Sequence, residues 1–265
     1  MLPKVGLALS GGGVRGFAHL GVLKVFKKHH IPIDVIAGTS SGALVAAFYA
    51  LGTDLEMLEK IFLRLDIKKL LNIRLHRMGF VSGDNLVQLI QLITQNRNIE
   101  DAVIPLRIVA ADLINRETVV FTRGNVAECI RASIALPGIF TPVKKDGRLL
   151  VDGSVLNNCP CDVVKKDADI VIAVNLEVKT QEEPAHVFEV FRRSLELMAE
   201  ARQLPLSDLV ISPIKKPVSQ FEFSRGKECL EMGERAAEEK IAEIKKLVGD
   251  FKKVQEKNLK IDEKN

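Results

Sequence analysis

The chain has 265 residues, of which 47% are hydrophobic and 27% are charged, a composition typical of a globular protein with a sizeable core. Its 38 basic and 34 acidic side chains leave a net charge of only +4, and 12 Phe are accompanied by one Tyr and no Trp. A charge this small, without a stacking platform, argues against binding of nucleic acid. Four dispersed cysteines, and no apolar run long enough for a signal peptide or a spanning helix, lead us to expect a cytoplasmic protein with reduced thiols and no bound metal.

Short apolar runs alternate along the chain with segments whose apolar residues recur at helical spacing. The predicted strands are Val5–Leu9, Ile33–Ala37, Arg107–Leu113, Thr118–Phe121, Arg148–Val151, Asp169–Leu176 and Leu209–Ser212. The predicted helices are Phe17–Lys28, Ser41–Leu51, Leu55–Leu65, Asn85–Thr94, Val187–Leu204 and Gly226–Val248. This alternation predicts an α/β fold with a mostly parallel central sheet and helices on both faces.

The pattern predicts one domain over residues 1–248. Strand patterns are absent between Thr53 and Asn98, so this stretch is interpreted as a helical insertion over the sheet. Residues 249–265 are highly charged, and we expect a fraying helix end or a disordered tail there.

A glycine-rich stretch follows the first predicted strand. Gly11, Gly13 and Gly16 spell G-x-G-x-x-G at the start of a predicted helix, as in a dinucleotide-binding loop. Such a site requires an acidic residue at the end of the second strand, whereas Asp34 lies at the start of that strand. The Lys-Ser/Thr pair of a P-loop and the Val-Ala-x-Lys strand of a kinase are also missing. A nucleotide-binding oxidoreductase therefore stays an alternative that the surrounding sequence does not favour.

The second predicted strand leads into Gly-Thr-Ser-Ser-Gly, which is G-x-S-x-G between a strand and a helix. This context is typical of a nucleophile elbow, a sharp turn that exposes the serine hydroxyl. The N-terminus of the following helix favours negative charge near Ser40. We therefore predict Ser40 as a nucleophile, with Gly38 and Gly42 allowing strand and helix to approach closely. An ordinary glycine-rich turn is the alternative.

A nucleophilic serine provides a different use for the first glycine loop. Acyl transfer requires hydrogen-bond donors that stabilise the oxyanion of the tetrahedral intermediate, and consecutive glycines present backbone amides without obstruction. We interpret Gly11, Gly12 and Gly13 as this oxyanion hole, with Gly16 in the supporting loop. Arg15 either adds positive potential, anchors the loop or lies on the helix surface.

The serine also requires a general base. None of the histidines stands at a strand end beyond the predicted nucleophile, the usual place in an α/β-hydrolase triad; they are His19, His29, His30, His76 and His186. Asp152 does stand at the end of an apolar run and is followed by glycine. It is therefore a candidate base, although a plain Asp-Gly turn has the same pattern.

Together the motifs resemble the patatin-like phospholipase family. The three motifs of that family are G-x-G-x-x-G, G-x-S-x-G and D-G-A/G, found here in the same order at 11–16, 38–42 and 152–154. Ser154 stands where the family has Ala or Gly. Residues 131–143 and 151–158 also resemble bacterial members, and the likeness covers about residues 5–176.

The resemblance implies a three-layer α/β/α fold and a Ser40–Asp152 dyad that works without a catalytic histidine or a cofactor. It also implies hydrolysis of phospholipid or lysophospholipid acyl esters through an acyl-enzyme. Basic and apolar residues alternate over residues 71–80 of the insertion, which suggests transient contact with a membrane surface. A catalytically silent lipid-binding or scaffolding protein of the same fold is the remaining alternative.

Overall fold

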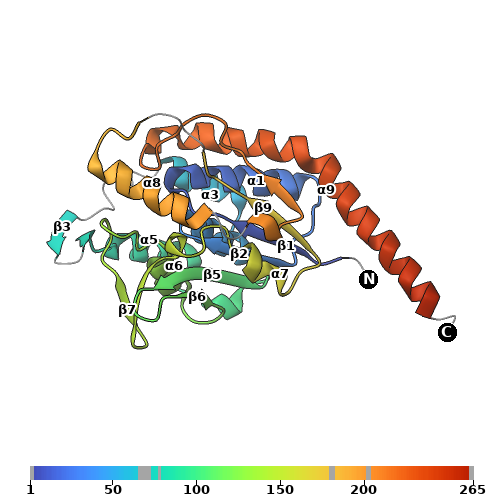
Figure 1. Cartoon of the computed structure of the whole chain (residues 1–265), viewed down its shortest axis with the longest axis horizontal. Helices are drawn as coiled ribbons and strands as arrows, with labels where there is room; N and C mark the ends of the chain where they lie inside the picture. The colour runs from blue at the N-terminus through green and yellow to red at the C-terminus, as the bar shows by residue number, and fades with distance from the viewer. Residues whose placement is uncertain (1–2, 65–72, 77–78, 179–182, 201–203, 263–265) are drawn as a thin grey trace.

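The computed structural model describes residues 3–64, 73–76, 79–178, 183–200 and 204–262 (Figure 1). Its centre is an eight-stranded sheet with the order β10-β9-β1-β2-β5-β8-β7, and β6 pairs with β5 outside this path. The strands are β1 (Val5–Leu9), β2 (Val35–Thr39), β5 (Leu106–Asp112), β6 (Glu117–Phe121), β7 (Val143–Lys145), β8 (Arg148–Asp152), β9 (Ile170–Val174) and β10 (Leu209–Ile211). Strands β10, β9, β1, β2 and β5 are parallel, whereas β6, β7 and β8 are added antiparallel, so the sheet is mixed and, as predicted, mostly parallel.

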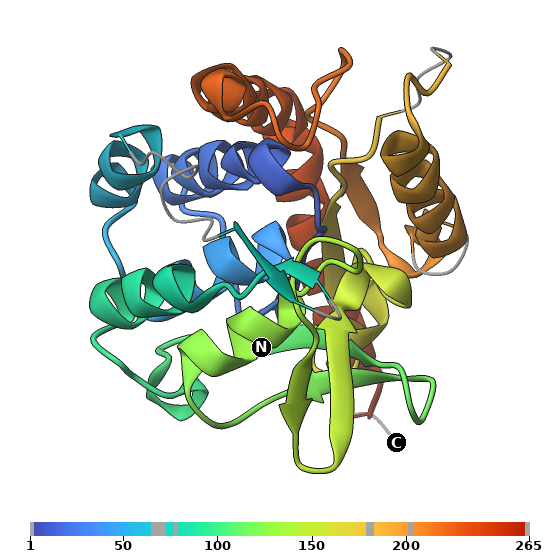
Figure 2. The same ribbon diagram turned by 90° about the vertical axis from the view of Figure 1, so that its left-hand side faces the viewer.

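The helices cover both faces of this sheet (Figures 1 and 2). They are α1 (Phe17–Lys28), α2 (Ser41–Ala50), α3 (Leu55–Arg64), α5 (Asp84–Thr94), α6 (Val126–Ser133), α7 (Cys161–Lys165), α8 (Val187–Glu200) and α9 (Gly226–Asp262). Helices α1, α2, α5, α6 and α9 share one apolar core with one face of the sheet, while α7 packs on the other face. The expected three-layer α/β/α fold is therefore confirmed.

The alternation of side chains in the central strands explains why two cores form. In β1, Leu7 faces the larger core and Ala8 the smaller core, because successive strand residues point to opposite faces. Every residue of β1, β2 and β9 is buried, as expected for parallel strands covered on both sides. The second strand ends at Thr39 rather than at Ala37, so Ser40 follows it directly.

Two local features bear on the sequence-based expectation. The insertion is not purely helical, because β3 (Ile73–His76) and β4 (Gly79–Val81) form a two-stranded antiparallel sheet. Strands this short carry too few residues for a clear period-2 pattern. Helix α9 continues to Asp262, through most of the segment for which a fraying helix end or a disordered tail is expected, and in Figure 1 this end projects from the body of the protein. Residues 263–265 lie outside the described part.

Candidate active site

Ser40 lies in a sharp elbow between β2 and α2. Its backbone angles, φ 54° and ψ −123°, are unfavourable for a residue with a side chain. The elbow can form only where strand and helix come very close. A Cβ atom on Gly38 would collide with the backbone of Gly42, and one on Gly42 would collide with the carbonyl of Leu9. The two glycines thus make room for the geometry that the G-x-S-x-G pattern predicts.

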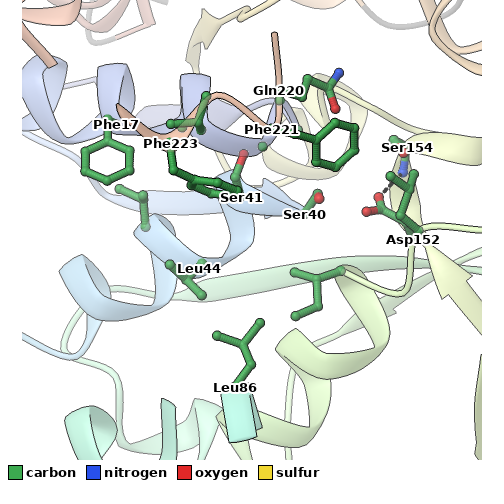
Figure 3. Close-up of a pocket in the computed structure, with 18 of the residues that line it drawn as sticks. Phe17, Ser40, Ser41, Leu44, Leu86, Asp152, Ser154, Gln220, Phe221 and Phe223 are labelled. Atoms are coloured by element: carbon green, nitrogen blue, oxygen red, sulfur yellow. Dashed lines mark hydrogen bonds between the residues drawn. The ribbon is translucent and has the colours of Figure 1, made fainter. Parts of the chain in front are cut away.

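Asp152 is the last residue of β8, opposite Ala110 of β5. Its side chain is only 2% exposed, and its Oδ1 accepts a hydrogen bond from the Ser154 amide at 2.9 Å. Burial raises the pKa of this carboxyl from 3.8 to about 6, while hydrogen bonds from Ser154 and from the Ser40 side chain act in the opposite direction. Figure 3 shows the side chains of Ser40 and Asp152 turned toward each other. A carboxylate with this pKa is largely ionised at neutral pH and is more basic than an ordinary aspartate.

The three glycines predicted as oxyanion donors differ in availability. The Gly11 amide donates to both the backbone oxygen and the Oδ1 of Asn158, each at 3.1 Å, and is therefore occupied. The amides of Gly12 and Gly13 make no hydrogen bond within the described residues. Gly13 has φ 59°, and a Cβ atom there would collide with the carbonyl of Gln220, so this position requires glycine. Gly12 and Gly13 are therefore the two candidate oxyanion donors.

Arg15 anchors the glycine loop from inside the protein. The side chain is 4% exposed, which contradicts a position on the helix surface. Its Nε donates to the carbonyl of Gly12 at 3.2 Å. The Gly16 position is also constrained, because a Cβ atom there would come within 2.7 Å of the Ser41 Cβ. The Arg15 hydrogen bond restricts how the Gly12 peptide can turn, and the missing side chain at Gly16 lets the loop lie close to the elbow.

A cavity of about 300 Å³ extends from the elbow between the helices of the larger core (Figure 3). Its polar end contains Ser40 and Asp152 beside the glycine loop. The rest of the wall is mainly apolar, and its members include Phe17, Leu44, Val45, Phe48, Phe62, Leu86, Leu89, Ile90, Ile93, Ile134, Leu136, Ile139, Phe140, Phe221 and Phe223. Such a cavity suits a hydrocarbon chain whose polar end lies at the serine.

Arg131, which is not one of the predicted site residues, connects two walls of this cavity. Its guanidinium donates to the carbonyl of Ser82, just before α5, at 2.6 and 2.9 Å. It also donates to the carbonyl of Thr141 at 2.8 Å and lies over the ring of Phe140. The position lies within the stretch that resembles bacterial family members, and that was its only sequence signal.

No histidine is among the residues described as lining the cavity. His19 is fully buried, donates from Nε2 to the Ser10 carbonyl at 2.7 Å, and has its pKa lowered to about 4 by burial. His29 pairs with Glu238 at 2.8 Å on the surface. His186 is exposed, and its Nδ1 accepts the Glu189 amide at the start of α8. The carboxylate of Asp152 is thus the base candidate nearest to the elbow among these groups.

An elbow serine at the end of a parallel strand, beside a glycine-rich loop and an apolar cavity, is the arrangement typical of α/β serine hydrolases. The model of the patatin-like phospholipase family matches residues 7–165, more than half of the chain. The chain belongs to this family.

Sequence relatives agree with the assignment. The chain is 37% identical over 177 residues to an uncharacterised NTE family protein of Mycobacterium tuberculosis, which covers 66% of this chain and 49% of the relative. It is 33% identical over 184 residues to patatin-like phospholipase domain-containing protein 7 of Rattus norvegicus, covering 65% of this chain and 13% of that protein. The chain therefore spans about half the length of the mycobacterial relative and a small part of the rat protein.

Solved structures share the fold at low sequence identity. VipD from Legionella pneumophila superposes with a TM-score of 0.66 and 15% identity, over 90% of this chain and 67% of that chain. The type III effector ExoU of Pseudomonas aeruginosa superposes with a TM-score of 0.54 and 14% identity, over 92% of this chain and 53% of that chain. At such identities the likeness supports the fold and carries no substrate information.

Proposed function

We propose that this chain hydrolyses carboxylic esters of lipids, with Ser40 as the nucleophile and Asp152 as the general base. The observation that carries the proposal is the strained serine facing a buried carboxylate at the polar end of an apolar cavity. Membership of the patatin-like phospholipase family supports lipid hydrolysis as the reaction class.

The proposed reaction proceeds in two steps. Asp152 accepts the hydroxyl proton while the Ser40 oxygen attacks the ester carbonyl, and the amides of Gly12 and Gly13 bind the oxyanion. The C–O bond to the alcohol breaks, the alcohol leaves with that proton, and an acyl-enzyme remains. Asp152 then takes a proton from water, which attacks the acyl carbonyl and releases the fatty acid and the serine hydroxyl. No cofactor enters this scheme.

The cavity favours a single acyl chain. Its volume of about 300 Å³ lies at the lower end of the range of about 300–1,000 Å³ for small-molecule sites, so we place one chain inside and the alcohol portion outside. Among the described lining residues, Asp152 is the only charged one. A lysophospholipid or another single-chain ester has one acyl chain for the apolar cavity and a polar alcohol portion that can stay outside it.

We also propose transient contact with a lipid surface. The side chains of the strip predicted at residues 71–80 lie outside the described ones, but α8 offers another surface. It packs against the turn η3 (Gly153–Val155) after Asp152, and the side chains of Val187, Val190, Phe191 and Leu197 are exposed. Since none of the described helices is long and apolar enough to span a bilayer, we propose surface contact of the kind made by an amphipathic helix.

A fluorophosphonate probe combined with single-chain esters tests the proposal. The probe should label Ser40, and peptide mapping should separate this site from the adjacent Ser41. Ser40→Ala should remain folded, lose labelling and lose hydrolysis, because the change removes only the attacking hydroxyl. Activity should rise with pH through about 6 as Asp152 ionises. Lipid binding without labelling or turnover would support the scaffolding alternative, and saturable NAD binding would support the oxidoreductase.

A further inference from the structure

Ser133, the last residue of α6, makes two hydrogen bonds beside the elbow. Its hydroxyl is fully buried, accepts the backbone N–H of Ser40 at 2.9 Å, and donates to the carbonyl of Val109 at 2.6 Å. The hydroxyl therefore links the turn that carries Ser40 to strand β5. Ser133 is absent from the described cavity lining, so it has no direct contact with a substrate there.

The bond to Ser40 matters because of the backbone conformation that it holds. A positive φ is unfavourable for serine, and the amide that points to Ser133 would lose its partner if the hydroxyl were removed. Both effects favour relaxation of the elbow. Rotation of the Ser40 backbone would move its Oγ relative to the carboxylate of Asp152 and to the glycine amides.

The residues that directly follow α6 also hold the backbone of Asp152, the other member of the proposed dyad. The backbone N–H of Asp152 donates to the carbonyl of Ala135 at 3.0 Å. Val109, which accepts the Ser133 hydroxyl proton, pairs in register with Thr39, and its neighbour Ala110 pairs with Asp152. One short segment, residues 133–135, thus binds the backbone amides of both Ser40 and Asp152.

We propose that Ser133 is a positioning residue that fixes Ser40 at the correct distance from Asp152 and from the oxyanion donors. This inference rests on the proposed function, because the positions it relates are those of the proposed dyad. Ser40 and Asp152 carry out the reaction, and Ser133 holds Ser40 in the position from which the reaction is fast.

Ser133→Ala tests this assignment against a matched control. Thr94→Val removes another fully buried hydroxyl that donates to a backbone carbonyl, that of Ile90 at 2.8 Å, at a site outside the described cavity lining. A misplacement of about 1 Å can cost about 100-fold in rate, so we expect Ser133→Ala to lower kcat and the rate of labelling at Ser40 by about 10- to 100-fold. Thr94→Val should change both rates by less than about twofold, since no reacting group moves.

Two further readouts separate positioning from general destabilisation. KM and the midpoint of the pH profile should stay unchanged in Ser133→Ala, because the cavity and the burial of Asp152 are intact. Ser133→Cys, which keeps a weak acceptor, should have an intermediate rate. It also serves if the alanine variant fails to fold. A folded Ser133→Ala protein labelled at the wild-type rate would overturn the proposal, as would an equal loss in Thr94→Val.

Amide hydrogen exchange tests the role of Ser133 independently of whether the protein hydrolyses esters. If the wild-type protein neither reacts with the probe nor hydrolyses esters, the proposed function fails. The Ser40 amide should still exchange faster in Ser133→Ala than in wild type or Thr94→Val, because its acceptor is gone. Unchanged protection of that amide would overturn the role of Ser133 whatever the activity.

Discussion

Replacing Asp152 by Asn should abolish hydrolysis and stabilise the protein at neutral pH. The wild-type carboxyl is buried, and burial raises its pKa from 3.8 to about 6. The folded protein therefore holds this proton more tightly than the unfolded chain, and ionisation costs folding free energy. Asn removes the charge, keeps an oxygen that can accept the Ser154 amide, and cannot act as the base.

The expected gain in the free energy of unfolding follows from the pKa shift of Asp152. A shift of about two pK units corresponds to about 3 kcal/mol at 1.36 kcal/mol per unit. Well below pH 3.8 the carboxyl is protonated in both the folded and the unfolded state, and the variant should match the wild type. The difference grows as pH rises from 3.8 to about 6 and is then constant. At pH 7 we expect a gain of about 3 kcal/mol, or roughly 6–12 °C in Tm for a domain of this size.

Urea unfolding at several pH values between 4 and 8, followed by circular dichroism, measures this difference. Asp112→Asn is the matched control, because the net pKa shift of Asp112 has the opposite sign. Burial alone would raise its pKa, but hydrogen bonds from Ile114, Asn115 and Leu149 outweigh burial and lower it. The control should lose stability at neutral pH. A destabilised Asp152→Asn, or a gain that does not vary with pH, would refute the reasoning.

Three further predictions concern the base, the cavity and the outer surface. His186→Ala should retain most of the activity, because the side chain is exposed and outside the described cavity wall; a loss equal to that of the nucleophile variant in an esterase assay would indicate a triad. Leu86→Trp narrows the cavity away from the dyad (Figure 3), so the kcat/KM ratio of octanoate to butyrate esters should fall several-fold, and an unchanged ratio would place the acyl chain elsewhere. Val187→Ser with Leu197→Ser should weaken vesicle sedimentation and hydrolysis of micellar esters while sparing monomeric esters, because these side chains are 84% and 67% exposed. Leu92→Ser is the control, since that leucine is 76% exposed on α5; equal effects of the two changes would argue against a specific surface on α8.

Local sequence was sufficient to predict the two strand–turn–helix units that contain the glycine loop and Ser40. An apolar strand followed by glycines and a helix, and a second strand followed by G-x-S-x-G and a helix, each describe a turn whose shape depends on its own residues. The structure contains both turns, and the glycines at Gly38 and Gly42 are required by contacts within a few residues or with the adjacent strand. The alternation of apolar runs and helical patterns predicted a sheet with helices on both faces, and the apolar run before Asp152 made it a candidate base. The resemblance to the family selected Asp152 from that pattern as the partner of Ser40.

Only the tertiary structure decided which distant groups meet. Asp152 reaches Ser40 because β8 adds antiparallel to β5 in one register, and a plain Asp-Gly turn has the same local sequence. The occupied amide of Gly11 and the roles of Asn158 and Ser133 likewise depend on contacts between segments far apart in the chain. The antiparallel pairing of β6 and β8 with β5 was not predicted, for the same reason. A short pattern determines the local backbone, whereas the pairing of strands, the burial that raises a pKa and the shape of a cavity depend on how all the elements pack together.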